Sequence, residues 1–161
     1  MGQLKKKNKN LMVEIEKKFT VNKVLWEKIK KPIPNVIKQS YISDEKKCTV
    51  RVRIKNNKGF LTIKGETINI SRSEYDYQIP LEDAQAMMDE FSSKTLFKNR
   101  YEVLVGDHLW EVDEFKGKLE GLIIAEIELK NENEKFELPN WIDKEVSNNP
   151  RYYNSNLIKE L

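Results

Sequence analysis

Hydrophobic and polar residues alternate along several short segments of the chain. In residues 12–20 and 47–55 the apolar side chains follow a period of two, which is typical of a β-strand with one buried face. The sequence NNKG at 56–59 has strong turn chemistry, and the alternation resumes at 60–66, so we expect a β-hairpin there. Further strands are predicted at 36–43, 71–79, 98–105, 108–115 and 121–130.

Other segments have the spacing of helices. Residues 21–31 place apolar residues at helical spacing ahead of two prolines, and residues 81–91 form an amphipathic pattern with one apolar side. Near the end of the chain we predict two short helices, at 138–146 and 149–161, separated at Pro150.

The predicted elements amount to about eight strands and a few helices, with no flexible linker and no internal repeat. A chain of 161 residues is long enough for one domain with a sizeable core. We therefore predict a single α+β domain, dominated by β-structure, over residues 11–161. Residues 1–10 are basic and polar, and we interpret them as a flexible tail.

On several strands the polar face carries two charged residues of the same sign, two positions apart. A sheet with one solvated face is the ordinary explanation for alternation, but such a face usually mixes residue types. Side chains two apart on one strand lie close enough to repel, so these pairs favour a face that holds opposite charges between them. The pairs are Glu14/Glu16, Arg51/Arg53, Lys98/Arg100 and Glu126/Glu128.

About eight antiparallel strands can close into a small barrel. If the charged face points inward, the interior becomes a polar tunnel and the apolar face is covered by helices. Arginine and lysine side chains in such a tunnel would bind a polyanion. Carboxylates in the same tunnel would bind Mg²⁺ or Mn²⁺, because both cations prefer oxygen ligands.

Composition narrows the classes of function. The chain has 29 Lys and Arg residues against 26 Asp and Glu, and the resulting formal charge of +3 is too small to indicate a nucleic-acid-binding protein. No apolar run is long enough to span a membrane. Cys48 is the single cysteine, so an internal disulfide is excluded, and a reduced, cytoplasmic protein is expected.

The segment VEIEKKF at 13–19 fits an ExExK signature, and with its companion segments the chain resembles the CYTH superfamily, the triphosphate tunnel metalloenzymes. The resemblance extends from about residue 12 to the end of the chain. It implies a closed, antiparallel, eight-stranded β-barrel with flanking helices. The companion segments follow in the family's order: RVRIK, LTIKG, RSEYDYQIP, KNRYEV, WEVDEFKGKLEGLIIAEIEL and EVSNNPRYYNSNL.

The resemblance also implies roles for the matching residues. The residues implied to bind the triphosphate are Lys18, Arg51, Arg53, Lys64, Arg72, Lys98 and Arg100. The residues implied to bind metal are Glu14, Glu16, Glu126 and Glu128, with Glu74, Asp76, Glu111 and Asp113 as further acids of the tunnel wall. Within these sets, Glu16, Lys18, Lys98 and Arg100 are implied to take part in catalysis.

The implied reaction is metal-dependent hydrolysis of a triphosphate, inorganic tripolyphosphate above all, to phosphate and pyrophosphate, with Mg²⁺ or Mn²⁺ as cofactor. Other activities of the family stay open, namely adenylate cyclase and nucleoside or thiamine triphosphatase, as does a non-catalytic polyphosphate-binding module. The expected partner is a small triphosphate-containing molecule, with no nucleic acid and no membrane. The resemblance is compatible with a monomer or a homodimer.

Four residues with reactive or aromatic side chains are expected to lie outside this site. His108 falls in a predicted turn and is expected to be an exposed loop residue. Trp110, Tyr75 and Tyr77 lie on the apolar faces of their strands, and we expect them in the core beneath the helices.

Overall fold

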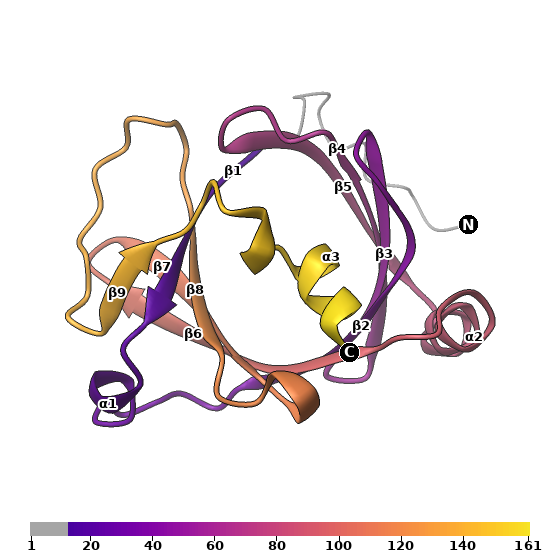
Figure 1. The fold of residues 1–161 in the computed structure, drawn as a ribbon, viewed down its shortest axis with the longest axis horizontal. Helices are drawn as coiled ribbons and strands as arrows, with labels where there is room; N and C mark the ends of the chain where they lie inside the picture. The colour runs from indigo at the N-terminus through magenta and orange to yellow at the C-terminus, as the bar shows by residue number, and fades with distance from the viewer. Residues whose placement is uncertain (1–12) are drawn as a thin grey trace, which may run out of the picture.

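The computed structural model describes residues 13–161, and its strands form a closed antiparallel barrel (Figure 1). The predicted tail at 1–10 lies outside the described residues. The strands are ordered β5-β4-β3-β2-β6-β7-β8-β1, and a pairing between β5 and β1 closes the ring. The predicted eight-stranded barrel is therefore confirmed. Its strands are β1 (Val13–Val21), β2 (Asn35–Glu45), β3 (Cys48–Lys55), β4 (Lys58–Gly65), β5 (Ser71–Ile79), β6 (Leu96–Val105), β7 (His108–Phe115) and β8 (Ile123–Glu128).

Tight turns fix the register of the two predicted hairpins. Between β3 and β4, Lys55 pairs with Lys58, and the two residues of the turn, Asn56 and Asn57, have φ angles of 46° and 62°. Two positive φ angles match the twist of the flanking strands. Between β6 and β7 the turn contains Gly106, which has a φ of 58°.

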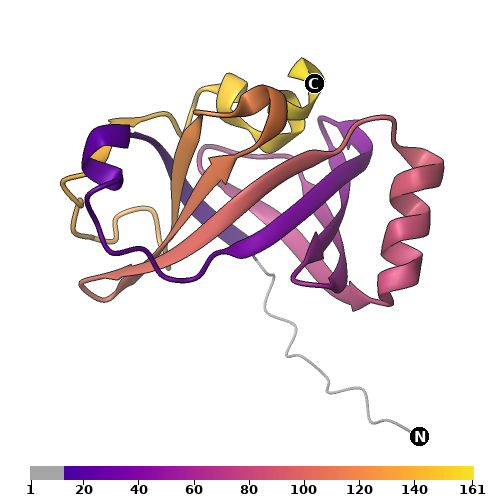
Figure 2. The same cartoon turned by 90° about the horizontal axis from the view of Figure 1, so that it is seen from below.

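Helix α2 (Leu81–Phe91) has the predicted bounds and lies outside the barrel (Figure 2). Its buried residues Ala84 and Met88 pack on Val52 of β3. The helix approaches β4 so closely at Gly59 that a Cβ atom there would lie 2.9 Å from the Cβ of Ala84. Glycine at this position therefore allows the helix to cover the sheet.

Helix α1 (Lys23–Trp26) is a single turn, much shorter than the helix predicted at 21–31. The Asn22 side chain accepts a hydrogen bond from the Leu25 N–H at its start. Trp26 is fully buried, whereas Val24 is 63% exposed. Trp26 and the partly buried Leu25 beside it pack into the core outside the barrel wall, and a single turn is enough to place both side chains.

The predicted helix at 138–146 is wrong, because its second half forms a ninth strand, β9 (Ile142–Glu145), along the edge of β1. The pairing of β1 with β5 ends at Ile15, which leaves the rest of that edge without a partner in the barrel. Strand β9 pairs with β1 at Phe19 and Val21 and supplies the missing hydrogen bonds. Next to β9, Trp141 packs edge-on against two other tryptophans in the core outside the barrel wall.

The C-terminal segment closes one end of the barrel from within (Figure 1). The predicted helix at 149–161 is broken into η2 (Pro150–Tyr152), α3 (Asn154–Leu157) and η3 (Ile158–Glu160). Leu157 and Ile158 pack on apolar residues of β6, β7 and β8. The barrel interior is therefore apolar at this end and charged elsewhere.

Trp110 is fully buried, as predicted, but the placement of two tyrosines in the core is wrong. Tyr75 is 46% exposed and Tyr77 is 54% exposed. Both lie on the outer face of β5, while α2 packs on β3 and β4. Among residues 13–161, no helix has the length and apolar content needed to cross a membrane.

Candidate active site

Opposite charges face each other across neighbouring strands inside the barrel. Residues paired across an antiparallel ladder point to the same face. Glu14 is paired with Arg72, Lys18 with Glu126, and Arg100 with Asp113. The same-sign pairs Glu14/Glu16 on β1 and Lys98/Arg100 on β6 are therefore compensated by charges on neighbouring strands, as the alternation predicts.

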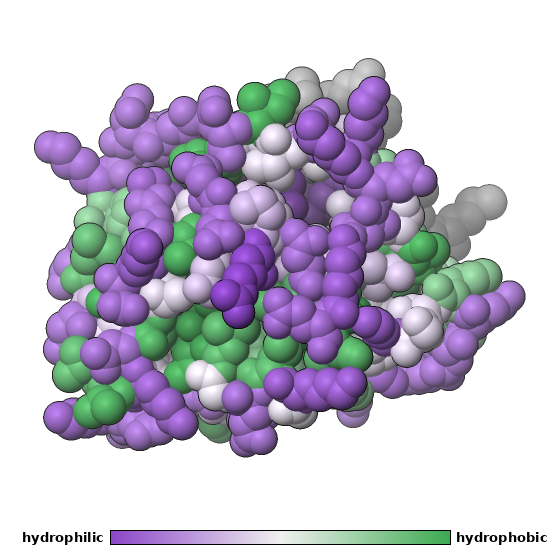
Figure 3. Space-filling model, in the orientation of Figure 1, coloured by the Kyte–Doolittle hydropathy of each residue, from purple (hydrophilic) through white to green (hydrophobic). Residues whose placement is uncertain are grey.

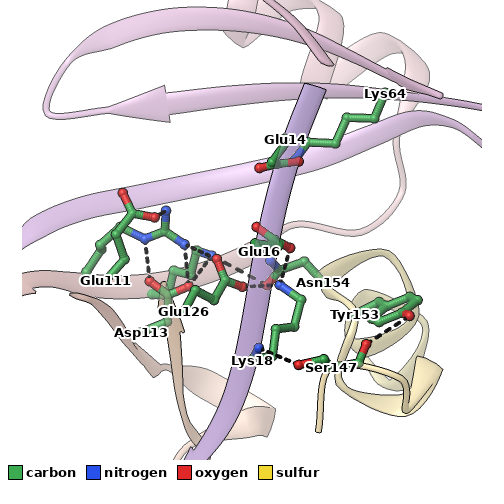
Figure 4. A network of polar contacts seen from close by, with 12 residues as sticks. Glu14, Glu16, Lys18, Lys64, Glu111, Asp113, Glu126, Ser147, Tyr153 and Asn154 are labelled. Carbon is green, nitrogen blue, oxygen red and sulfur yellow. Dashed lines mark hydrogen bonds and ion pairs between the residues drawn. The ribbon is translucent and has the colours of Figure 1, made fainter. Parts of the chain in front are cut away.

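Lys18 lies at the centre of this network (Figure 4). Its ammonium group is 2.8 Å from a carboxylate oxygen of Glu16 and donates to Glu126. Burial alone would lower the pKa of Lys18, but the Glu126 and Glu16 carboxylates outweigh that effect and raise it. Lys18 is therefore a permanent cation at neutral pH.

Arg100 is held by three acids of two other strands. Its guanidinium donates to both oxygens of Asp113, at 2.6 and 2.7 Å, to Glu126 at 3.3 Å, and to Glu111. Burial opposes its charge, but these carboxylates raise its pKa well above the ordinary value. Glu126 is shared between Lys18 and Arg100, and these cations outweigh its burial and hold its pKa well below the ordinary range.

Lys98 lies on the same face of β6 as Arg100, at the end of the barrel that the C-terminal segment closes. Its side chain is 1% exposed, and its ammonium donates to Asp113 at 2.6 Å and lies over the Phe115 ring. Burial, together with the nearby Arg100 cation, lowers its pKa to about 8 despite the Asp113 carboxylate.

The central cavity of the barrel measures about 860 Å³, and all predicted site residues line it except Lys98, Asp113 and Asp76.

Glu14 joins β1 to two basic residues farther along the cavity. Its carboxylate lies 3.0 Å from the Lys64 ammonium and 2.9 Å from Arg72 Nε. Lys64 also contacts Glu74 at 2.7 Å. Burial would lower the pKa of Arg72, but Glu14 and Glu16 raise it. These four side chains form a second compensated cluster, on β1, β4 and β5.

Arg51 and Arg53 have fewer acidic partners than the other cations. Arg51 donates to the Thr62 hydroxyl at 3.1 Å, and the nearest carboxylate oxygen of Arg53, on Asp76, is 3.7 Å away. The Nε groups of both arginines are buried and have no hydrogen-bond partner within the described part of the chain. Burial, with repulsion from Arg51 and Arg100, lowers the pKa of Arg53 to about 10. This wall of the cavity carries surplus positive charge.

Glu128 is an acid of the cavity that has no basic partner among the described residues. Within residues 13–161 it forms no ion pair. Partial burial raises its pKa, and the carboxylates of Glu14, Glu111, Glu74 and Glu16 add to the effect. The described residues contain no group of three acids, histidines or cysteines already drawn together around a metal-sized space. Glu128 is thus a free carboxylate among acids that are paired with bases.

The C-terminal segment contributes residues that the charge pattern could not indicate. The Lys18 N–H donates to the Ser147 hydroxyl at 3.0 Å, and the Tyr153 hydroxyl donates to the Ser147 carbonyl at 3.1 Å (Figure 4). Asn154 lies 3.4 Å from the Lys98 ammonium. Tyr41 of β2 also lines the cavity. Its position on an alternating strand was the only signal in the sequence.

The expectation that His108 is an exposed loop residue is wrong. It begins β7, is partly buried, and its Nε2 lies 3.0 Å from Glu134 at the edge of the cavity. Glu134 belongs to the segment between β8 and β9, which has no alternating pattern. Its proximity to His108 could not be read from the sequence.

The sequence profile of the CYTH domain matches residues 12–159. The chain belongs to the CYTH family. It is 46% identical over 147 residues to an inorganic triphosphatase of Acetivibrio thermocellus, covering 91% of this chain and 93% of that protein. It is 30% identical over 154 residues to an inorganic triphosphatase of Nitrosomonas europaea, covering 93% and 99%.

Solved structures of the CYTH fold agree with this assignment. The crystal structure of an inorganic triphosphatase is similar with a TM-score of 0.64 and 28% identity, covering 90% of this chain and 97% of that one. A putative adenylate cyclase from Bacillus halodurans, at 16% identity, shares the fold with a TM-score of 0.60 over 75% of this chain and 83% of its own.

Proposed function

We propose that this CYTH protein hydrolyses inorganic tripolyphosphate to phosphate and pyrophosphate inside its barrel. The observation that carries the proposal is the pair of cavity-lining arginines, Arg51 and Arg53, whose buried Nε donors have no partner among the described residues. Buried donors without partners are costly, and phosphate oxygens are suitable acceptors for arginine. The names of the two inorganic triphosphatases similar to this chain support the choice of substrate.

The proposed hydrolysis breaks one phosphoanhydride bond. A water oxygen forms a bond to a terminal phosphorus, the bond from that phosphorus to its bridging oxygen breaks, and the pyrophosphate leaves with the electron pair. One water proton stays on the phosphate product, and the other passes to the pyrophosphate. Lys18 and Arg100 would neutralise the charge that develops on the phosphate oxygens. Their own carboxylate partners keep both cations in fixed positions, so little reorganisation is needed when the substrate binds.

Lys98 and Asp113 would act on the site indirectly. Asp113 holds two nitrogens of Arg100 and is itself held by Lys98. We propose that these two residues position Arg100. Lys64 and Arg72 would bind phosphate oxygens farther along the tunnel, because both line the cavity beside Glu14.

We also propose that the reaction depends on a divalent cation, Mg²⁺ or Mn²⁺. The donor set fits, because Glu128 has no base among the described residues, is paired with Glu16 across the ladder between β1 and β8, and lines the same cavity as Glu14. Carboxylate oxygens are the ligands that these cations prefer. Glu128, Glu14 and Glu16 would hold the ion. When bound, it would draw electron density from the phosphate oxygens and help to position the attacking water.

The test is release of phosphate from tripolyphosphate, ATP and thiamine triphosphate, each with Mg²⁺, with Mn²⁺ and with a chelator. We expect tripolyphosphate with a divalent ion to be the fastest substrate. A preference for ATP or thiamine triphosphate would favour a nucleotide- or thiamine-handling member instead, and binding without turnover would favour a non-catalytic module. A cytoplasmic location and the choice between monomer and homodimer remain predictions.

A further inference from the structure

The cavity has a rim, formed by the turn between β6 and β7 and by the segment after β8, that carries two lysines outside the site described above. Lys130 and Lys135 both line the cavity here, beside His108. Within the described part of the chain, neither ammonium group has a hydrogen bond or an ion pair. The inner cations Lys18 and Lys64, in contrast, each contact two carboxylates.

The backbone at Lys130 is fixed on both sides. The Leu129 N–H donates to the Ile15 carbonyl at 2.8 Å, which continues the pairing of β8 with β1. The Lys130 N–H donates to the Glu134 carboxylate. Lys130 follows two residues after Glu128, the last residue of β8, and lines the same cavity as Glu126 and Glu128.

The position of Lys135 is fixed by its two neighbours. Glu134 accepts from Lys130 and lies 3.0 Å from His108 Nε2. Phe136 packs edge-on against Phe19, Trp110 and His108. Lys135 therefore sits between two anchored side chains.

Two of the acids at this rim are occupied. The Glu134 carboxylate is taken up by the Lys130 N–H and His108, and that of Glu111 by Arg100. Among the described residues, Glu128 and Asp107 of the turn have no basic partner, and the segment after β8 also carries Glu132 and Glu137. A triphosphate that arrives with its metal ion carries both signs, and the rim offers two free ammonium groups beside these carboxylates.

We propose that Lys130 and Lys135 form an entry site for the polyphosphate anion, which captures the metal-complexed substrate at the rim before it reaches the arginines inside. This proposal rests on the proposed function for its substrate. Two ammonium groups at the rim make the encounter with an anion faster than it would be without them, and salt weakens this attraction because the Debye length is about 8 Å at physiological ionic strength. The entry site raises the association rate of the substrate, and the inner residues carry out the chemical step.

The experiment compares the double variant Lys130→Gln/Lys135→Gln with Lys28→Gln/Lys30→Gln. The control removes the same charge from two exposed lysines that do not line the cavity. Association of tripolyphosphate is measured by stopped flow, without added metal and with Mg²⁺, and kcat and kcat/KM are measured with Mg²⁺, all at low and at high salt. We expect the rim variant to lose about threefold to tenfold in association rate and in kcat/KM at low salt. Its kcat should stay within about twofold, and the loss should fade at high salt.

Equal association rates for the two double variants would overturn the entry site, as would a loss confined to kcat. The binding measurement does not depend on turnover. A wild-type protein that binds tripolyphosphate without hydrolysing it would contradict the proposed function and still decide the role of the rim.

Discussion

The backbone N–H of Lys18 donates to the side-chain hydroxyl of Ser147, 129 residues later in the chain, at 3.0 Å. This bond joins the strand that carries the central cation to the segment that closes one end of the barrel. Ser147 in turn donates to Glu145 of β9 at 2.8 Å. The C-terminal segment is therefore part of the wall that holds the charged network.

Ser147→Ala should lower the free energy of unfolding by about 1 kcal/mol, because it leaves a buried N–H of β1 without its acceptor. Chemical denaturation measures the change. Ser93→Ala is the matched control, since Ser93 is exposed and lies outside these contacts. Equal stability of the two variants would show that the C-terminal segment is not anchored at Lys18.

Glu126→Gln should abolish most turnover while tripolyphosphate still binds. The substitution removes the carboxylate shared by Lys18 and Arg100, so each cation loses one of the acids that hold it and the two are no longer linked. Breaking a buried pair in this way also costs about 3–5 kcal/mol of stability. Phosphate release and calorimetric binding are measured together with Glu90→Gln, which changes an exposed acid of α2. Normal turnover by Glu126→Gln would exclude the proposed role of Glu126.

Acid should destabilise the protein through the same carboxylates. The pKa values of Glu126 and Asp113 are held below the ordinary range by Lys18, Arg100 and Lys98, despite burial. The pKa of each carboxyl is lower in the folded state than in the unfolded state. Its stabilising effect is therefore complete at a pH above the unfolded-state pKa and is lost as the pH falls through the folded-state pKa. Unfolding measured from neutral pH downwards should show the loss below about pH 4. A flat profile would contradict the burial of these pairs.

Gly59→Ala should destabilise the protein by about 1–3 kcal/mol, the usual cost of overpacking. The added methyl would meet the Cβ of Ala84 and the backbone oxygens of Ile79 and Pro80, each at 2.9 Å. Thermal unfolding measures the effect, with Lys58→Ala as an exposed control in the same strand. An unchanged midpoint would show that α2 does not sit as closely on β4 as described.

Much of this barrel can be read from period-two alternation. The pattern places Glu14, Lys18 and Arg53 on inner faces, and turn chemistry at Asn56 fixes a hairpin. These signals are local, since each depends on residues only a few positions apart. The charge pattern therefore predicts which charged side chains line the tunnel, although not the partner of each one.

The features that could not be predicted depend on distant segments. Strand β9 pairs with the edge of β1 that β5 leaves without a partner beyond Ile15. The sequence of residues 138–146 does not indicate that this edge is available. The burial of Lys98 behind Asp113 depends on where β6 meets β7 and the C-terminal segment. The contact of His108 with Glu134 depends on the path of a segment without periodicity.

The central claim is that the inner wall at Arg51 and Arg53 binds the triphosphate. The most direct test is calorimetric titration of tripolyphosphate into the wild-type protein and into Arg51→Gln/Arg53→Gln, both without metal. Arg151→Gln is the control, since Arg151 is exposed and does not line the central cavity. We predict that the double variant remains folded and loses at least about tenfold in affinity, because two charge-assisted donors are removed. Unchanged affinity in a folded double variant would contradict binding of the triphosphate at Arg51 and Arg53.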